Sequence, residues 1–231
     1  RFYSPRGLAC DASGNLYVAD TGNGRIRVID IGLKCATLSG GFTGVVDVSV
    51  GPNGDIIAVD KAEHCIYRIE PGGRKFIAAG DRGSDGDEYG MDGNVKVKGS
   101  AAMFSNPEAA TVAADGKIYV ADVGNGSIKV IDTDGWVNKI GETSENVQDL
   151  VISPKGNRLF FLAAGGIYSM DMDGDEGVVA SLGESGGIGL TVDMAETIYA
   201  IVGSSAPIED EVSSASSVSS ESSSSSSPAD D

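Results

Sequence analysis

The chain is poor in the residues that most often carry catalysis and metal binding. Its 231 residues include a single histidine, His64, and three cysteines, Cys10, Cys35 and Cys65, with no CxxC pair. One histidine excludes a zinc cage of several histidines and a general acid and base formed by two histidines within this chain. Three scattered cysteines do not indicate a disulfide framework, although one bond between two of them stays open. Cys10 lies in an apolar stretch, which predicts a buried thiol.

Long apolar runs and basic residues are also scarce. No run approaches the roughly 18 residues that a membrane-spanning helix requires, and no charged-then-apolar leader is visible. Arg1 in place of Met fits either a processed, secreted product or a fragment of a larger protein, so the compartment stays open. The formal charge of −17, with the basic residues scattered along the strands, repels phosphate backbones. We therefore expect no nucleic-acid binding.

What the sequence has in quantity is a repeated strand pattern. A turn position recurs at spacings of 40, 62, 40 and 40 residues, at Gly14, Gly54, Gly116, Gly156 and Glu196. An apolar run on each side of this position predicts a β-hairpin, because Gly adopts the positive φ of a tight turn while Val, Ile and Tyr fit a pleated strand. The runs after the turns are nearly continuously apolar, which is typical of strands covered on both faces.

Two further strands follow in four of the copies. The third strand closes on an acidic residue each time, and we expect it at 26–30, 66–70, 128–132 and 167–171. The fourth is expected at 34–38, 75–79, 136–140 and 178–182. Four strands per unit of about 40 residues predict an all-β fold, a β-propeller of antiparallel blades with four full blades and part of a fifth. A parallel α/β arrangement is disfavoured, because no stretch between strands has a helical apolar period.

Two copies resemble the units of a known family. PRGLACDASGNLYVADTGNGRIRVID, near the N-terminus, and FSNPEAATVAADGKIYVADVGNGSIKVID, residues 104–132, are similar to NHL-repeat propellers, and the resemblance extends over about residues 1–203. It implies a propeller fold and no particular activity. NHL propellers commonly close with six blades. The resemblance therefore implies a fragment, a partner that supplies the remaining blades, or an open ring.

Oxygen-bearing side chains recur where the second strands end. Asp20, Asp60 and Asp122 close this strand in three copies, and Asn23 and Asn125 follow three residues later in two of them. If they converge on one face of the propeller, they offer oxygen ligands to calcium. Alternatively, each Asp accepts hydrogen bonds from the backbone of its own loop. The local role is favoured, because a metal site usually breaks a repeat whereas this motif follows it.

Two acidic loops depart from the repeat. A 22-residue insertion before Gly116 contains Asp85, Asp87, Glu88, Tyr89 and Asp92. Long loops on a rigid scaffold are where binding residues tend to lie, so we predict a partner-binding loop here. Tyr89 is either an exposed anchor or a residue that packs the loop. The second loop, MDMDGDEG at 170–177, has the alternating acids of an EF-hand but lacks its glycine and its final glutamate, which favours a solvated turn.

His64 and the C-terminal tail complete the survey. His64 aligns with Gly24 and Gly126 in the turn between the second and third strands, which predicts a turn residue rather than a catalytic one. Residues 204–231 contain 14 serines, six acids and no aromatic residue. This composition predicts a disordered tail, as a linker or a modified stalk.

These observations favour a non-catalytic scaffold over an enzyme. No convergent catalytic set is visible, and the strand at 197–202 is expected to form an unpaired edge of the kind that recruits partners. We therefore predict a binding propeller with a protein partner and without a cofactor. The alternative is a calcium-dependent propeller hydrolase of the lactonase or gluconolactonase kind.

Overall fold

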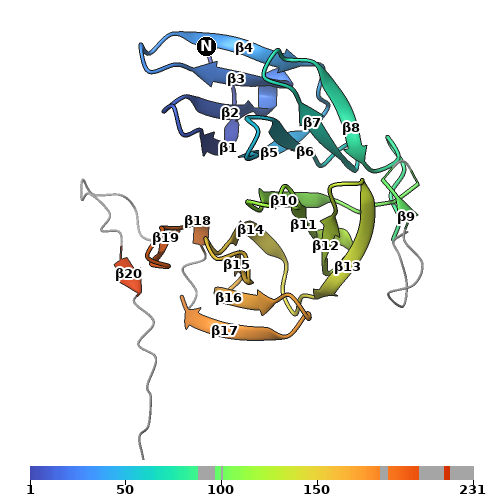
Figure 1. Ribbon diagram of the computed structural model, residues 1–231, viewed down its shortest axis with the longest axis vertical. Coiled ribbons are helices and arrows are strands. Elements are labelled where there is room, and N and C mark those ends of the chain that lie inside the picture. The colour runs from blue at the N-terminus through green and yellow to red at the C-terminus, as the bar shows by residue number, and fades with distance from the viewer. Residues whose placement is uncertain (88–96, 100, 183–186, 203–215, 219–231) are drawn as a thin grey trace, which may run out of the picture.

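The computed structural model describes residues 1–87, 97–99, 101–182, 187–202 and 216–218. These residues form five antiparallel sheets arranged around a common axis (Figure 1). Four sheets have their strands in sequence order, from the axis to the outside. The all-β propeller predicted from the repeat is therefore confirmed. None of the described helices is long and apolar enough to cross a membrane.

The strands of each blade follow one another as the repeat predicts. Blade 1 contains β1 (Pro5–Cys10), β2 (Leu16–Asp20), β3 (Arg25–Ile29) and β4 (Cys35–Gly40). Blade 2 contains β5 (Val45–Val50), β6 (Ile56–Asp60), β7 (Cys65–Ile69) and β8 (Lys75–Ala79). Blade 3 contains β10 (Pro107–Val112), β11 (Ile118–Asp122), β12 (Ser127–Ile131) and β13 (Trp136–Glu142). Blade 4 contains β14 (Val147–Ile152), β15 (Arg158–Ala163), β16 (Gly166–Asp171) and β17 (Glu176–Ser181).

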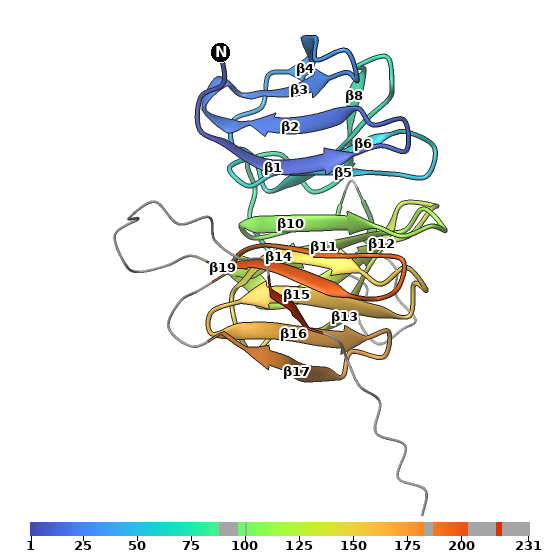
Figure 2. The same cartoon turned by 90° about the vertical axis from the view of Figure 1, so that its left-hand side faces the viewer.

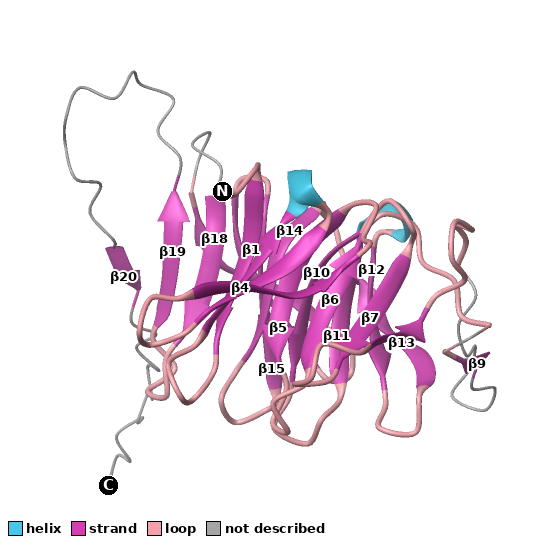
Figure 3. Cartoon of the chain, turned by 90° about the horizontal axis from the view of Figure 1, so that it is seen from above, coloured by secondary structure: helices cyan, strands magenta, loops and turns pink. Residues whose placement is uncertain are grey.

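The fifth sheet and the short additions depart from this plan. The fifth sheet contains β18 (Gly187–Val192), β19 (Ile198–Val202) and β20 (Ser216–Val218), so β20 pairs three tail residues with β19. The rest of the predicted disordered tail lies outside the described residues. From the insertion, β9 (Val97–Lys98) adds a fifth strand to the outer edge of blade 3. Two short 3₁₀ turns, η1 (Thr21–Asn23) and η2 (Val123–Asn125), lie on the same face of the propeller (Figure 3).

The turn residues have the backbone that the sequence pattern requires. Gly14 has φ of 84°, and even Glu196, which replaces glycine in the fifth copy, has φ of 63°. His64 has φ of 56°, in register with Gly24 at 59°. This left-handed conformation is natural for glycine and strained for most other residues. The interpretation of these positions as turns is therefore confirmed.

The core lies between neighbouring blades. Separate apolar clusters fill the spaces between blades 1 and 2, blades 2 and 3, blades 3 and 4, and blade 4 and the fifth sheet. Every residue of β6 and β11 is buried, as expected for strands that are covered on both faces. Burial of these apolar faces contributes about 25 cal/mol per Å² to the stability of the fold.

One burial prediction is wrong. Cys10 is exposed, whereas Cys65 is buried, and all three cysteines are free thiols. β1 alternates between exposed and partly buried residues, whereas the equivalent β10 is mostly buried. The reason is topological, since the described sheets leave the ring open between blade 1 and the fifth sheet (Figure 2). One face of β1 therefore has no neighbouring blade among the described residues, whereas blades 2 and 4 flank β10.

Candidate functional site

The first strands of the blades and β19 enclose a cleft of about 760 Å³ along the propeller axis. Its walls combine carboxylates with apolar side chains, and residues from all five sheets contribute. Two of its charged side chains meet in an ion pair, Arg6 Nη2 to Glu108 Oε1 at 2.8 Å, and Lys61 contacts the other oxygen of Glu108. This cluster joins blades 1, 2 and 3 at the edge of the cleft, because each blade supplies one of its members.

Two further carboxylates of the cleft hold neighbouring blades together. Asp47 of β5 accepts a hydrogen bond on Oδ2 from the backbone NH of Ala110 in blade 3, at 2.9 Å. Asp149 of β14 accepts one on Oδ2 from the NH of Leu190 in the fifth sheet, at 2.7 Å. Each carboxylate therefore spans the boundary to the following sheet.

These aspartates alternate with small residues around the axis. The equivalent position lies just after the bulge in each first strand, and in sheet order it is Gly7, Asp47, Ala109, Asp149 and Gly189. The small residues give space to the carboxylates. A Cβ atom added to Gly7 would lie 2.5 Å from Asp47 Oδ1, which is far inside van der Waals contact.

Sequence reasoning missed Asp47 and Asp149. A signal was present, since VVDVSV and VQDLVI each place an acid within an apolar strand where other copies have Gly or Ala. Such a residue requires a buried hydrogen-bond donor. The donors belong to the next blade, so the sequence of one repeat does not reveal them.

Burial dominates the electrostatics of the cleft. It raises the pKa of Asp47 to about 7, and the nearby carboxylates of Asp149 and Glu108 raise it further, against the hydrogen bond from Ala110. Burial also raises the pKa of Asp149. A desolvated carboxylate near like charges binds its proton more tightly. The cleft therefore contains an acid that changes its charge near neutral pH.

The three aspartates predicted from the repeat lie elsewhere, within their own blades, and each is fully buried. Asp20 Oδ1 accepts the NH of Tyr3 at 2.8 Å, and Asn23 donates to the same carboxylate at 2.9 Å. Asp122 Oδ1 accepts the NH of Ser105 at 2.7 Å.

Asp60 makes the equivalent contacts, because it accepts the NH groups of Thr43 and Gly44, each at 2.8 Å. Each aspartate thus fastens the end of the second strand to the loop that precedes the first. We call this arrangement the blade clasp. Among the described residues, no group of three or more His, Cys, Asp or Glu side chains is positioned to hold a metal ion.

The described part of the insertion is fastened to the clasp of blade 3. The ammonium group of Lys129 lies 2.7 Å from Asp122 Oδ2 and 2.8 Å from Asp87 Oδ1, and its side chain is fully buried. Asn125 donates to the carbonyl of Gly86 at 2.7 Å, and Asp85 forms a β-bridge with Phe104. The other predicted loop residues, Glu88, Tyr89 and Asp92, lie outside the described residues.

The buried charge of Glu63 was not predicted from the sequence. Glu63 accepts hydrogen bonds from Arg82 at 2.5 Å, Thr43 at 2.6 Å and Tyr67 at 2.5 Å. Burial opposes ionisation, but these three donors outweigh it and lower the pKa of Glu63 to about 2. The beginning of the insertion is therefore attached to blade 2 through Arg82.

His64 joins two blades at its turn. Its Nδ1 accepts a hydrogen bond from the backbone NH of Asn106 at 3.1 Å, which links the β6–β7 turn to the loop before β10. A ring nitrogen that accepts from a backbone amide is occupied by a structural contact.

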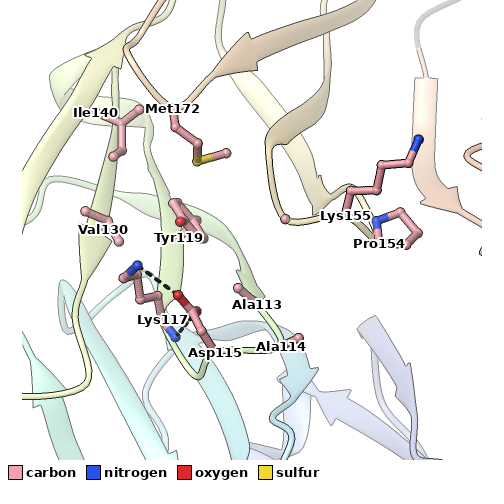
Figure 4. A pocket seen from close by; sticks show the side chains of 11 residues that line it. Ala113, Ala114, Asp115, Lys117, Tyr119, Val130, Ile140, Pro154, Lys155 and Met172 are labelled. Atoms are coloured by element: carbon pink, nitrogen blue, oxygen red, sulfur yellow. Dashed lines mark hydrogen bonds and ion pairs between the residues drawn. The ribbon is translucent and has the colours of Figure 1, made fainter.

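A smaller pocket of about 440 Å³ lies between blades 3 and 4 (Figure 4). Apolar side chains such as Tyr119 and Met172 line it. Lys117 forms an ion pair with Asp115 at 2.8 Å, and Lys155 forms one with Glu196 at 2.6 Å. Because its lysines are engaged in this way, the pocket is a weaker candidate than the axial cleft.

Comparison with known proteins places the fold. The model of the NHL repeat matches residues 2–29 and 104–131, which lie in blades 1 and 3. Together with the blade architecture, these two matches support an NHL-repeat β-propeller. No curated protein matches the sequence.

Several solved structures share the fold. A streptogramin B lyase has a TM-score of 0.64 at 13% identity, over 85% of this chain and 61% of its own. Virginiamycin B lyase from Staphylococcus aureus has a TM-score of 0.63 at 16% identity, over 85% and 62% of the two chains. A gluconolactonase from Xanthomonas campestris has a TM-score of 0.53 at 13% identity, over 88% and 84%. The chain thus spans about three fifths of the lyases' length, and these identities show the fold alone.

Proposed function

We propose that this chain is a non-catalytic binding propeller that holds a protein partner at its axial cleft. One observation carries the proposal: in the described part of the chain, the histidine and the buried aspartates that are candidates for chemistry are engaged in structural bonds. His64 accepts a backbone hydrogen bond, the clasp aspartates hold loops, and Asp47 and Asp149 join blades. General acid or base catalysis needs a group that is free to reach its substrate. The cleft offers a concave surface with exposed apolar side chains and hydrogen-bonding groups, which suit the binding of a protein partner.

A matched pair of variants tests this proposal. Gln148 is exposed in the cleft, whereas Val178 is exposed on β17, the outermost strand of blade 4. The full chain, Gln148→Trp and Val178→Trp serve as baits in extracts of the source cells, with recovered proteins quantified by mass spectrometry. We expect Gln148→Trp to lower recovery of specific partners at least tenfold and Val178→Trp to leave it unchanged. Equal recovery by all three baits would remove the cleft from partner binding.

The second candidate is a hydrolase, and two observations favour it. The fold is similar to that of a gluconolactonase, and three carboxylates, Asp47, Glu108 and Asp149, line the cleft. The described residues form no three-ligand metal group, so we derive no step through calcium. In the lyase fold, a catalytically inactive His-to-Ala variant of the Staphylococcus aureus enzyme has been solved with quinupristin. This chain has one histidine, which weakens a lyase reading.

A hydrolysis assay separates the two candidates. Purified protein is mixed with gluconolactone, with and without Ca²⁺, and ring opening is followed by proton release. The binding propeller predicts no turnover above the uncatalysed rate. Turnover that requires Ca²⁺ and falls at least a hundredfold in Asp149→Asn would contradict the binding propeller and support the hydrolase.

A further inference from the structure

The opening of the ring is an apolar gap with a wall on each side. Leu8 of β1 is 60% exposed, and Ile201 of β19 is 62% exposed. Both line the axial cleft, together with the partly exposed Tyr199, so the two walls face a common space. Large apolar side chains that are exposed on both sides of one cleft are typical of an interaction surface.

The order of residues around the axis indicates what fits between these walls. Asp47 lies between Gly7 and Ala109, and Asp149 lies between Ala109 and Gly189, so each carboxylate has a small residue on both sides. The opening is bordered by Gly189 on one side and Gly7 on the other. The opening therefore has the two small residues of the same small–acid–small pattern, with no acid of the described sheets between them.

The hydrogen bonds follow the same order. The carboxylate of one sheet accepts the NH of the residue just after the small position of the next, Ala110 in blade 3 and Leu190 in the fifth sheet. Leu8 occupies this position in blade 1. A carboxylate that entered the opening beside β1 would meet Leu8 as Asp47 meets Ala110.

We propose that the opening binds an extended β-strand of a partner protein, with an aspartate or glutamate inserted between Gly189 and Gly7. The proposal rests on the proposed function, since it names the partner chemistry of the same cleft. It continues the interface that already joins the described blades. The formal charge of −17 repels an acidic partner at a distance. The remaining residues of the strand are therefore apolar, neutral or basic.

The chain itself provides a probe of this kind. A fluorescent hairpin peptide of residues 45–60, VVDVSVGPNGDIIAVD, carries Asp47 as the single acid of its first strand, whereas Asp55 and Asp60 lie outside that strand and are common to the peptide and its control. Its matched control contains Asp47→Ala. Binding to the full chain is measured by fluorescence anisotropy at physiological salt. We expect saturable binding of the first peptide and at least tenfold weaker binding of the second. Equal binding of the two peptides, or binding of neither, would overturn the proposal.

Variants of the full chain locate the binding. Leu8→Glu and Ile201→Glu change exposed walls of the opening, and Val178→Glu makes the same change on β17, where the side chain is 71% exposed. We expect the first two to weaken peptide binding at least tenfold and the third to leave it unchanged. A loss of binding common to all three would place the peptide elsewhere. If the chain self-associates and Leu8→Glu abolishes this association, the occupant of the opening is a second copy of the chain. This result would also overturn the proposal.

Failure of this inference is distinguishable from failure of the proposed function. If the peptide does not bind but Gln148→Trp still lowers partner recovery, the cleft binds a protein that is not an acidic strand. If Gln148→Trp has no effect while the peptide binds as expected, the opening accepts a strand and the cleft interior is not the partner site.

Discussion

Asp47 is a half-buried carboxylate that joins blades 2 and 3. It accepts the NH of Ala110, it lies against Gly7, and it is close enough to Asp149 and Glu108 for their charges to raise its pKa. Two effects on the pKa oppose each other in such a site. The hydrogen bond favours the ionised form of the carboxyl group, and burial favours the protonated form.

The pH dependence of stability should reveal this competition. The pKa of Asp47 in the folded chain, about 7, lies above the value of about 3.9 for an unfolded aspartate. The stability it contributes is therefore complete below about pH 4 and is lost as pH rises through 7. We expect Asp47→Asn to be more stable than the parent by about 1–3 kcal/mol at pH 8.5, with little difference at pH 4. Urea denaturation at both pH values measures this.

The control for this experiment is Asp173→Asn, which changes an exposed turn on blade 4. It should leave the difference between pH 4 and pH 8.5 unchanged. If Asp47→Asn lowered stability equally at both pH values, the hydrogen bond rather than the charge would be the dominant contribution of Asp47.

At the scale of elements, the blade clasp is the recurrent stabilising unit. It ties the end of the second strand to the loop before the first, through fully buried carboxylates in blades 1, 2 and 3. Blade 3 adds Lys129, so its clasp also contains a buried ion pair.

Removing the acid of this clasp should be costly. Asp122→Ala removes the fully buried carboxylate that lies 2.7 Å from the ammonium group of Lys129, which keeps its contact with Asp87 at 2.8 Å, and it leaves the NH of Ser105 without its acceptor. We expect a loss of about 3–5 kcal/mol in the free energy of unfolding, measured by urea denaturation. Replacing the ion pair by Asp122→Ala with Lys129→Met should recover part of the loss. A double variant less stable than the single one would contradict this account.

The elements themselves were largely predictable, and their contacts were not. The hairpins follow from local rules, since a turn glycine and the flanking apolar runs suffice to place β1 with β2, and the same rule accommodates Glu196. The exposure of Cys10 and the role of Asp47 depend on which sheet lies beside which, whereas the ion pairs of Lys129 depend on how the insertion packs against blade 3. That information resides in the arrangement of the sheets around the axis, so the strands were predicted while the cleft was not.

At the scale of the whole molecule, the net charge governs which partners approach. Of the −17 charges, six belong to the tail and the remaining 11 to the propeller. A field of this sign opposes the phosphate contacts that supply most nonspecific nucleic-acid affinity.

We therefore expect no RNA or DNA binding at physiological salt. A gel-shift experiment with single-stranded RNA should show free RNA at protein concentrations up to about 10 μM, where nonspecific binders begin to associate. Lowering the salt should not produce a complex, because here electrostatics is repulsive. A shifted band that strengthens at low salt would mean that the scattered lysines and arginines form a basic face.

The alternation of Asp47 and Asp149 with small residues also limits how this ring can be rearranged. The strand pattern of the sequence recurs in every blade, whereas the type of side chain at the axis recurs in every second blade. Odd and even blades are therefore not interchangeable. A single transplanted blade would set two carboxylates, or two gaps, side by side. We therefore expect this propeller to tolerate the exchange or duplication of two adjacent blades better than that of a single blade.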